Sequence, residues 1–179
     1  RVLEGAVFAL CAKDDITGAD GKVIMKADTV IEELATDKEG KLTFTADLPI
    51  GFAYYIKETS PASGFATTDE IQEFTFEYEG AEKEKVSYAF TFEDEPTVIE
   101  ITKTSLTDGK ELEGAKLQVT DESGKVVDSW TSGKEAHIIK ELVVGQKYTL
   151  TETKPADGFV TAESITFTVE DTVEAQKIE

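Results

Sequence analysis

The stretch YTLTETKPADGF, from Tyr148 to Phe159, is nearly repeated by YYIKETSPASGF, from Tyr54 to Phe65. In each copy apolar and polar side chains alternate up to a glutamate, and a Pro-Ala-x-Gly-Phe segment follows. Alternation with a period of two is typical of a half-buried β-strand, and Pro and Gly mark the turn that ends it. The pattern therefore predicts two strands that each carry one glutamate, Glu58 or Glu152, on the apolar face.

Other segments repeat in the same order. LEGAVFAL at 3–10 returns as LEGAKLQV at 112–119, an offset of 109, whereas the two glutamates are 94 residues apart. The first copy therefore carries about 15 extra residues, which we place within 13–33. A repeated layout of this kind indicates two homologous domains. We assign them to residues 1–97 and 98–179.

Nearly all of the predicted secondary structure is β-strand. KADTVIEELA at 26–35 has no sustained helical period and is interpreted as strand or loop. Many short strands with x-Gly-Lys turns between them predict an all-β fold with a β-sandwich in each domain. The further alternating runs are KLTFTADL at 41–48, EFTFEY at 73–78, VSYAFTF at 86–92, VIEITK at 98–103 and SITFTV at 164–169.

The composition excludes several classes of partner. A formal net charge of −19, from 37 acidic and 18 basic residues, argues against nucleic acid and anionic membranes as partners.

A single cysteine cannot form an intrachain disulfide, and Cys11 lies in the apolar run VFALCA, which favours a core position. The sequence has no phosphate-binding loop, zinc spacing or Ser-His-Asp set, so we expect no enzyme active site and no cofactor or metal.

Three features leave alternatives open. Asp14, Asp15, Asp20 and Asp28 crowd the insertion and permit a calcium site, although no D-x-D-x-D-G loop is present. The lone histidine is interpreted as a structural or surface residue. The lone tryptophan is interpreted as a strand residue near a turn, with sugar stacking as the alternative.

Alternation along the strands predicts that two further ionisable side chains face the core. Lys103 shares the face of Ile99 and Ile101, and Asp94 shares the face of Phe90 and Phe92. An isolated buried charge is costly, so such groups are expected to be paired or neutral. The alternative is that each lies at a strand end and reaches water.

Inward-facing lysine and carboxyl groups permit one specific reaction. Burial lowers the pKa of a lysine and raises the pKa of a carboxylic acid. A neutral amine is a nucleophile, a neutral carboxyl or carboxamide carbon is an electrophile, and a second carboxyl group can carry the proton between them. The product is an amide between two side chains. It forms once per molecule, which is maturation and not enzymatic turnover.

The LEGA segments, together with Y-x-(L/I)-x-E-T-x-P-A-x-G-F, resemble the Cna B-type or SpaA-type (prealbumin-like) repeat domains of Gram-positive surface adhesins and pilins. The resemblance covers nearly the whole chain in two copies and implies immunoglobulin-like β-sandwiches. In that family a lysine on the first strand forms an isopeptide bond with an Asn or Asp on the last strand, and a glutamate promotes the bond. The resemblance assigns Lys103 as donor in the second domain, with Glu58 and Glu152 as the promoting glutamates.

By the same resemblance, each domain lacks one partner. Asp94 matches the acceptor of the first domain, whose donor lysine would lie ahead of Arg1. The acceptor of the second domain would lie past Glu179, and Asp171 is a weaker candidate because it belongs to the preceding strand. Three explanations stay open: a longer repeat array, strands supplied from elsewhere, or bonds that do not form.

The resemblance implies a structural stalk module of a pilus or cell-surface protein, extracellular and attached to the Gram-positive cell wall. Its expected partners are neighbouring Cna B-type domains of the same polypeptide. The alternative is an adhesin module that recognises a host extracellular protein or glycan through the insertion at 13–33. A β-sandwich accessory to a secreted enzyme is a weaker alternative.

Overall fold

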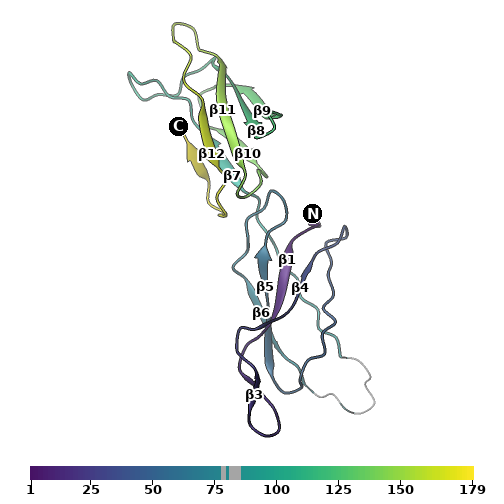
Figure 1. The fold of residues 1–179 in the computed structure, drawn as a ribbon. Coiled ribbons are helices and arrows are strands. Elements are labelled where there is room, and N and C mark those ends of the chain that lie inside the picture. The colour runs from purple at the N-terminus through teal and green to yellow at the C-terminus, as the bar shows by residue number, and fades with distance from the viewer. Residues whose placement is uncertain (78–79, 81–85) are drawn as a thin grey trace. The chain divides into compact units, whose positions relative to one another are not determined.

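The computed structural model describes residues 1–77, 80 and 86–179, and the regular secondary structure in these ranges is β-strand. The chain divides into two units (Figure 1). Unit 1 contains Arg1–Ala62 and Thr67–Asp94, and unit 2 contains Ser63–Ala66 and Glu95–Glu179. No helix in the described part of the chain is long and apolar enough to cross a membrane.

Unit 2 is a sandwich of two sheets. The larger sheet has the strand order β12-β11-β8-β9, and the smaller has the order β10-β7-β13. In the smaller sheet β7 lies in the middle, antiparallel to β10 and parallel to β13. The strands are β7 (Val98–Ile101), β8 (Lys116–Asp121), β9 (Val126–Thr131), β10 (His137–Lys140), β11 (Lys147–Lys154), β12 (Ile165–Thr168) and β13 (Gln176–Ile178).

The core of unit 2 draws on both sheets. Ile99 and Ile101 of the central strand β7 share one apolar cluster with Val119 of β8 and with Tyr148 and Leu150 of β11. Each fully buried aliphatic side chain contributes about 1.5–3 kcal/mol relative to exposure. The cluster therefore holds β7 firmly against the larger sheet, and Lys103 lies two residues after the end of this strand.

Unit 1 contains a four-stranded antiparallel sheet with the order β4-β1-β5-β6 and a separate β2-β3 hairpin. Within KADTVIEELA, Val30–Ala35 forms β4 and the residues before it lie in a turn, which confirms the interpretation as strand or loop. Cys11 on β1 is fully buried beside Ala9 and Tyr55, as expected for a core residue. The strands are β1 (Val7–Ala12), β2 (Ile16–Thr17), β3 (Val23–Met25), β4 (Val30–Ala35), β5 (Ala53–Ser60) and β6 (Ile71–Thr75).

Two predicted strands of unit 1 are not assigned as strands. Residues 41–48 and 86–92 largely alternate between half-buried and exposed positions, but neither range forms a ladder. The 94-residue offset aligns 43–46 with β10, which in unit 2 pairs with the central β7. A strand needs a partner for its hydrogen bonds, and the described residues of unit 1 include no counterpart of β7.

The predicted strand at 73–78 is formed in part, because β6 covers Ile71–Thr75. Tyr78, its last predicted residue, lies outside the described residues. With strands as the regular secondary structure of both units, the prediction of an all-β chain with two tandem β-sandwich domains is confirmed.

Candidate functional site

Two buried glutamates occupy matching places in the two units. Glu58 on β5 lies opposite Phe8 of β1, and Glu152 on β11 lies opposite Leu117 of β8. Each glutamate is only 5% exposed. Their burial confirms the prediction from strand alternation. Charged residues are rarely this buried unless they are paired or hydrogen-bonded.

The turn that follows each strand supplies a hydrogen bond to the glutamate. The Thr68 backbone N–H donates to Glu58 Oε2 at 2.7 Å, and the Ala162 backbone N–H donates to Glu152 Oε2 at 2.5 Å. Both donors lie ten residues after their acceptor, so the Pro-Ala-x-Gly-Phe segments return the chain to the same place. In each copy the same hydrogen bond fixes the orientation of the carboxyl group.

In unit 2 the buried glutamate is next to the predicted donor lysine. Lys103 Nζ is 4.0 Å from Glu152 Oε1, and the lysine side chain is 22% exposed. The Thr102 N–H donates to the Ile178 carbonyl of β13, and the Leu112 N–H donates to the Lys103 carbonyl. These backbone bonds hold the lysine between the last strand and the LEGA segment, with its side chain directed to the glutamate.

In unit 1 the buried glutamate is next to a second carboxyl group. Burial raises the pKa of Asp94, and a hydrogen bond with Glu58 lowers it in part. Asp94 Oδ1 is buried and has no hydrogen-bond partner in the described part of the chain. Because a hydrogen bond between two carboxyl groups needs a proton on one of them, the pair carries at most one negative charge when bonded.

The structure therefore brings together Lys103 with Glu152 and Asp94 with Glu58. Asp171, the weaker acceptor candidate, lies at an exposed bend between β12 and β13. Strand alternation in the sequence predicted that the paired side chains face the core. No sequence pattern predicted which backbone amides bind the two glutamates. They depend on the path of the loop after each strand.

The insertion in unit 1 contains the β2-β3 hairpin. Lys26 Nζ donates to Asp15 Oδ2 at 2.8 Å, and this hydrogen bond, with one from the Ala27 N–H, lowers the pKa of Asp15. Tyr55 on β5 donates to Asp28 Oδ1 at 2.9 Å. Within the described residues no group of three or more His, Cys, Asp or Glu side chains could hold a metal ion. Ion pairs and hydrogen bonds thus account for these two aspartates.

The single tryptophan and histidine of the chain contact one another in unit 2. The rings of Trp130 on β9 and His137 on β10 stack with centroids 4.0 Å apart and planes at 9°. His137 Nε2 lies 2.8 Å from Asp128 Oδ2. Trp130 also packs against the core of unit 2, so its ring has a structural role between two sheets.

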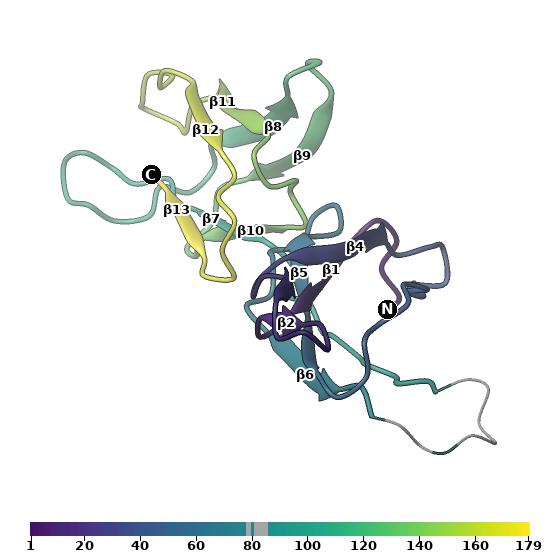
Figure 2. The same cartoon turned by 60° about the horizontal axis from the view of Figure 1, so that its bottom comes forward.

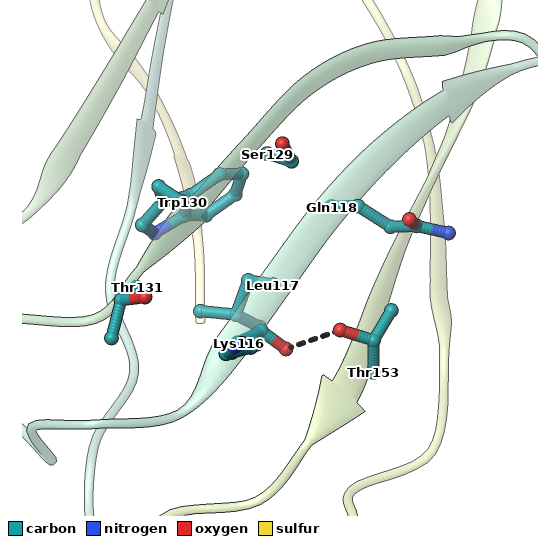
Figure 3. Close-up of a pocket in the computed structure, with 7 residues that line it drawn as sticks. All are labelled: Lys116, Leu117, Gln118, Ser129, Trp130, Thr131 and Thr153. Carbon is teal, nitrogen blue, oxygen red and sulfur yellow. Dashed lines mark hydrogen bonds between the residues drawn. The ribbon is translucent and has the colours of Figure 1, made fainter.

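A surface pocket of about 320 Å³ lies beside Trp130 (Figure 3). Its walls come from β8, β9 and β11, and Thr153 Oγ1 donates to the Lys116 carbonyl across it at 3.2 Å. Lys116 is its single ionisable side chain, so it offers no acid–base pair. The lining residues are Lys116, Leu117, Gln118, Ser129, Trp130, Thr131 and Thr153.

The chain is similar to several solved structures and spans only part of some of them. The Bacillus anthracis TIE protein matches with 24% identity and a TM-score of 0.55 over 99% of this chain, which spans 30% of that protein. A streptococcal ancillary pilin matches with 23% identity and a TM-score of 0.39, over 99% of this chain and 57% of its own. The shaft pilin SpaA of Lactobacillus rhamnosus GG matches with 17% identity and a TM-score of 0.39, over 98% and 86%.

No curated protein sequence matches the chain. The family model for SpaA, described as a prealbumin-like fold domain, matches residues 1–89 and again residues 97–179. The two matches cover nearly all of the chain and agree with the repeat of LEGA and of the buried glutamates. The chain therefore belongs to the SpaA family of prealbumin-like fold domains, of which it contains two copies.

Proposed function

We propose that the chain is a pair of structural stalk modules in an extracellular, cell-wall-attached pilus or surface protein of a Gram-positive bacterium. In this proposal an isopeptide bond between a lysine and an Asp or Asn side chain closes each unit. Neighbouring modules of the same polypeptide are the partners. Membership of the SpaA family supports a structural module, and the buried ionisable pairs support the isopeptide bonds.

One observation carries the proposal: Glu152, 5% exposed, lies beside Lys103, with 4.0 Å between Nζ and Oε1. Removing these two groups from water is costly, and such an ion pair seldom repays the cost in stability. Unit 1 buries Glu58 in the matching place and pairs it with Asp94 instead. A chemical role explains why both units keep a buried carboxyl group at one position.

The reaction is a condensation. The uncharged lysine amine attacks the side-chain carbonyl carbon of the acceptor, a C–N bond forms, and the C–OH bond of an aspartic acid breaks. The buried glutamate accepts a proton from the amine and returns one to the leaving hydroxyl, so water is released, or ammonia when the acceptor is Asn. In unit 1 the raised pKa of Asp94 favours the neutral acid, which is the better electrophile.

The bond would join the first strand of a unit to its last strand. In unit 2 these are β7 and β13, which are parallel neighbours, and Lys103 follows β7 at the end where Ile178 pairs with Ile101. The acceptor then lies on the continuation of β13, with Asp171 as the weaker candidate. By the loop-entropy relation, a cross-link around most of a unit stabilises it by roughly 4–5 kcal/mol. It would also prevent the two strands from separating under tension.

The intact mass of the natural polypeptide that contains these residues tests the proposal. We expect a mass lower than that of the plain sequence by one water or one ammonia for each unit. Glu152→Ala should abolish the loss from unit 2, because the proton carrier is removed. Thr151→Ala is the matched control on the opposite face of the same strand, and it should keep the loss. A mass equal to the plain sequence would contradict the proposal.

A further inference from the structure

Unit 2 includes a short segment from an earlier part of the chain, Ser63–Ala66, which belongs to the first Pro-Ala-x-Gly-Phe copy. The Ala66 N–H donates to the Glu95 carbonyl at 3.0 Å. The Thr97 N–H donates to the Gly64 carbonyl, also at 3.0 Å. The segment is therefore bound by main-chain hydrogen bonds to the residues that lead into β7.

A turn between β10 and β11 contacts the same segment. A Cβ atom on Gly64 would lie 2.7 Å from the Glu141 carbonyl oxygen, so only glycine fits this close approach. The Glu141 N–H donates to the Thr97 carbonyl at 3.1 Å, and Thr97 Oγ1 donates to the Leu142 carbonyl at 2.6 Å. Residues 95–97 and 141–142 together form what we call the loop-binding surface.

The second Pro-Ala-x-Gly-Phe copy has the same backbone conformation without such a surface beside it. Gly158 has a φ of 85°, and Gly64, at the matching position, has a φ of 86°. A Cβ atom on Gly158 would meet no described residue within 4 Å. The conformation is therefore a property of the motif itself, whereas the close contact at Gly64 depends on the loop-binding surface.

The exposure of the apolar side chains also differs between the two copies. Phe65 is 7% exposed and Ala66 is 1% exposed, whereas their counterparts Phe159 and Val160 are 44% and 89% exposed. Figure 2 shows residues 155–164 as a loop that extends past the ends of β11 and β12. Exposed apolar side chains that are adjacent in this way are typical of an interaction site.

The loop-binding surface and the exposed loop lie at opposite ends of β11. Leu142 belongs to the turn ahead of Lys147, the first residue of the strand, and the loop follows Lys154, the last. Eight residues of strand span about 26 Å at about 3.3 Å per residue. A module that binds a loop at one end and presents its own loop at the other can join further modules head to tail.

We propose that the loop Asp157–Val160 docks on a further SpaA-type module of the same polypeptide. The partner surface has the chemistry of the loop-binding surface: an extended x-Pro-Thr segment ahead of the first strand, and a turn with an accessible main-chain carbonyl. The inference rests on the part of the proposed function that makes neighbouring modules the partners.

Two observations favour a module of the same polypeptide over a second molecule. A contact of four residues is far smaller than the roughly 1,200 Å² that a stable complex of two free proteins buries, but tethering raises the effective concentration of the partner. In addition, each copy of this chain already fills its loop-binding surface with its own Ser63–Ala66.

Thiol labelling of Val160→Cys tests the proposal, in the 179-residue chain and in the natural polypeptide that contains these residues. The natural Cys11 is fully buried and adds little background. We expect labelling at position 160 to be at least about tenfold slower in the natural polypeptide, because docking covers the thiol. Val126→Cys is the control, 47% exposed at the other end of the larger sheet, and it should label equally in both.

A second substitution checks that the loop docks as its first copy does. Gly158→Ala should restore fast labelling of Val160→Cys in the natural polypeptide, because the added Cβ would meet the partner's main chain as it would at Gly64. Gly124→Ala, in a turn with a φ of 81°, introduces similar backbone strain elsewhere and should not restore it. Equal restoration by both substitutions would contradict this mode of docking.

A photoreactive side chain at position 160 then identifies the partner. Cross-links to the x-Pro-Thr segment or to the matching turn of a further module support the proposal, whereas cross-links to another chain or to any other surface overturn it. Equal labelling in both proteins overturns it as well, whether or not the intact mass shows isopeptide bonds. Slow labelling with the mass of the plain sequence supports docking and contradicts the bonds, so the two proposals fail separately.

Discussion

At the scale of single residues, each unit buries a glutamate at the same position, but the group beside the glutamate differs between the units. Glu152 is buried beside an amine at 4.0 Å, and Glu58 is buried beside another carboxyl group. Opposite charges lower the cost of burial, whereas two carboxyl groups lower it by sharing a proton. The stability of unit 1 should therefore depend on the proton that Asp94 holds.

The raised pKa of Asp94 gives the sign of this dependence. The folded protein holds the proton more tightly than the unfolded chain, so the free energy of unfolding falls as pH rises from the ordinary aspartate value of 3.8 through the raised pKa. Asp94→Asn removes this loss. The variant should gain stability relative to the parent at pH 7, and the gain should shrink toward pH 3.5. Urea unfolding at both pH values checks this, and a difference independent of pH would contradict the assignment.

At the scale of elements, strand formation depends on a partner that local sequence does not contain. His137–Lys140 forms β10 because β7 lies beside it, whereas the predicted strand at 41–48, with its regular alternation, forms no ladder. The face on which a side chain lies depends only on the alternation within its own strand, so the burial of Glu58 and Glu152 could be predicted. Pairing is not local, and neither is the contact between Trp130 and His137, which come from different sheets.

The central position of β7 predicts where unit 2 is most sensitive to truncation. Ile99 is 0% exposed in the core, so Ile99→Ala should lower the free energy of unfolding by about 2–5 kcal/mol. Ile138 on the neighbouring strand β10 is 45% exposed, so the same substitution there should cost less than about 0.5 kcal/mol. Chemical denaturation of both variants checks this. Equal losses would show that β7 is not the centre of the sheet's packing.

At the scale of the whole molecule, the repeat made the fold class and the number of domains predictable. Turn signals and alternation recur in both halves, and the family model matches both. Of the candidate site, the sequence predicted only the ionisable residues that a single strand places on its inner face. The acceptor of unit 2 and the donor of unit 1 stay a proposal, because the parity of one strand does not identify a partner on another strand.

The central claim is that an isopeptide bond closes each unit, and single-molecule stretching of the natural polypeptide tests it most directly. The measurement gives the length released when each unit unfolds. With an isopeptide bond from Lys103 to the continuation of β13, the chain from Lys103 to Glu179 stays closed, and it adds no length at forces that unfold ordinary domains. Glu152→Ala should release it, roughly 250 Å at about 3.3–3.6 Å per residue. Release of that length by the unaltered protein would contradict the account.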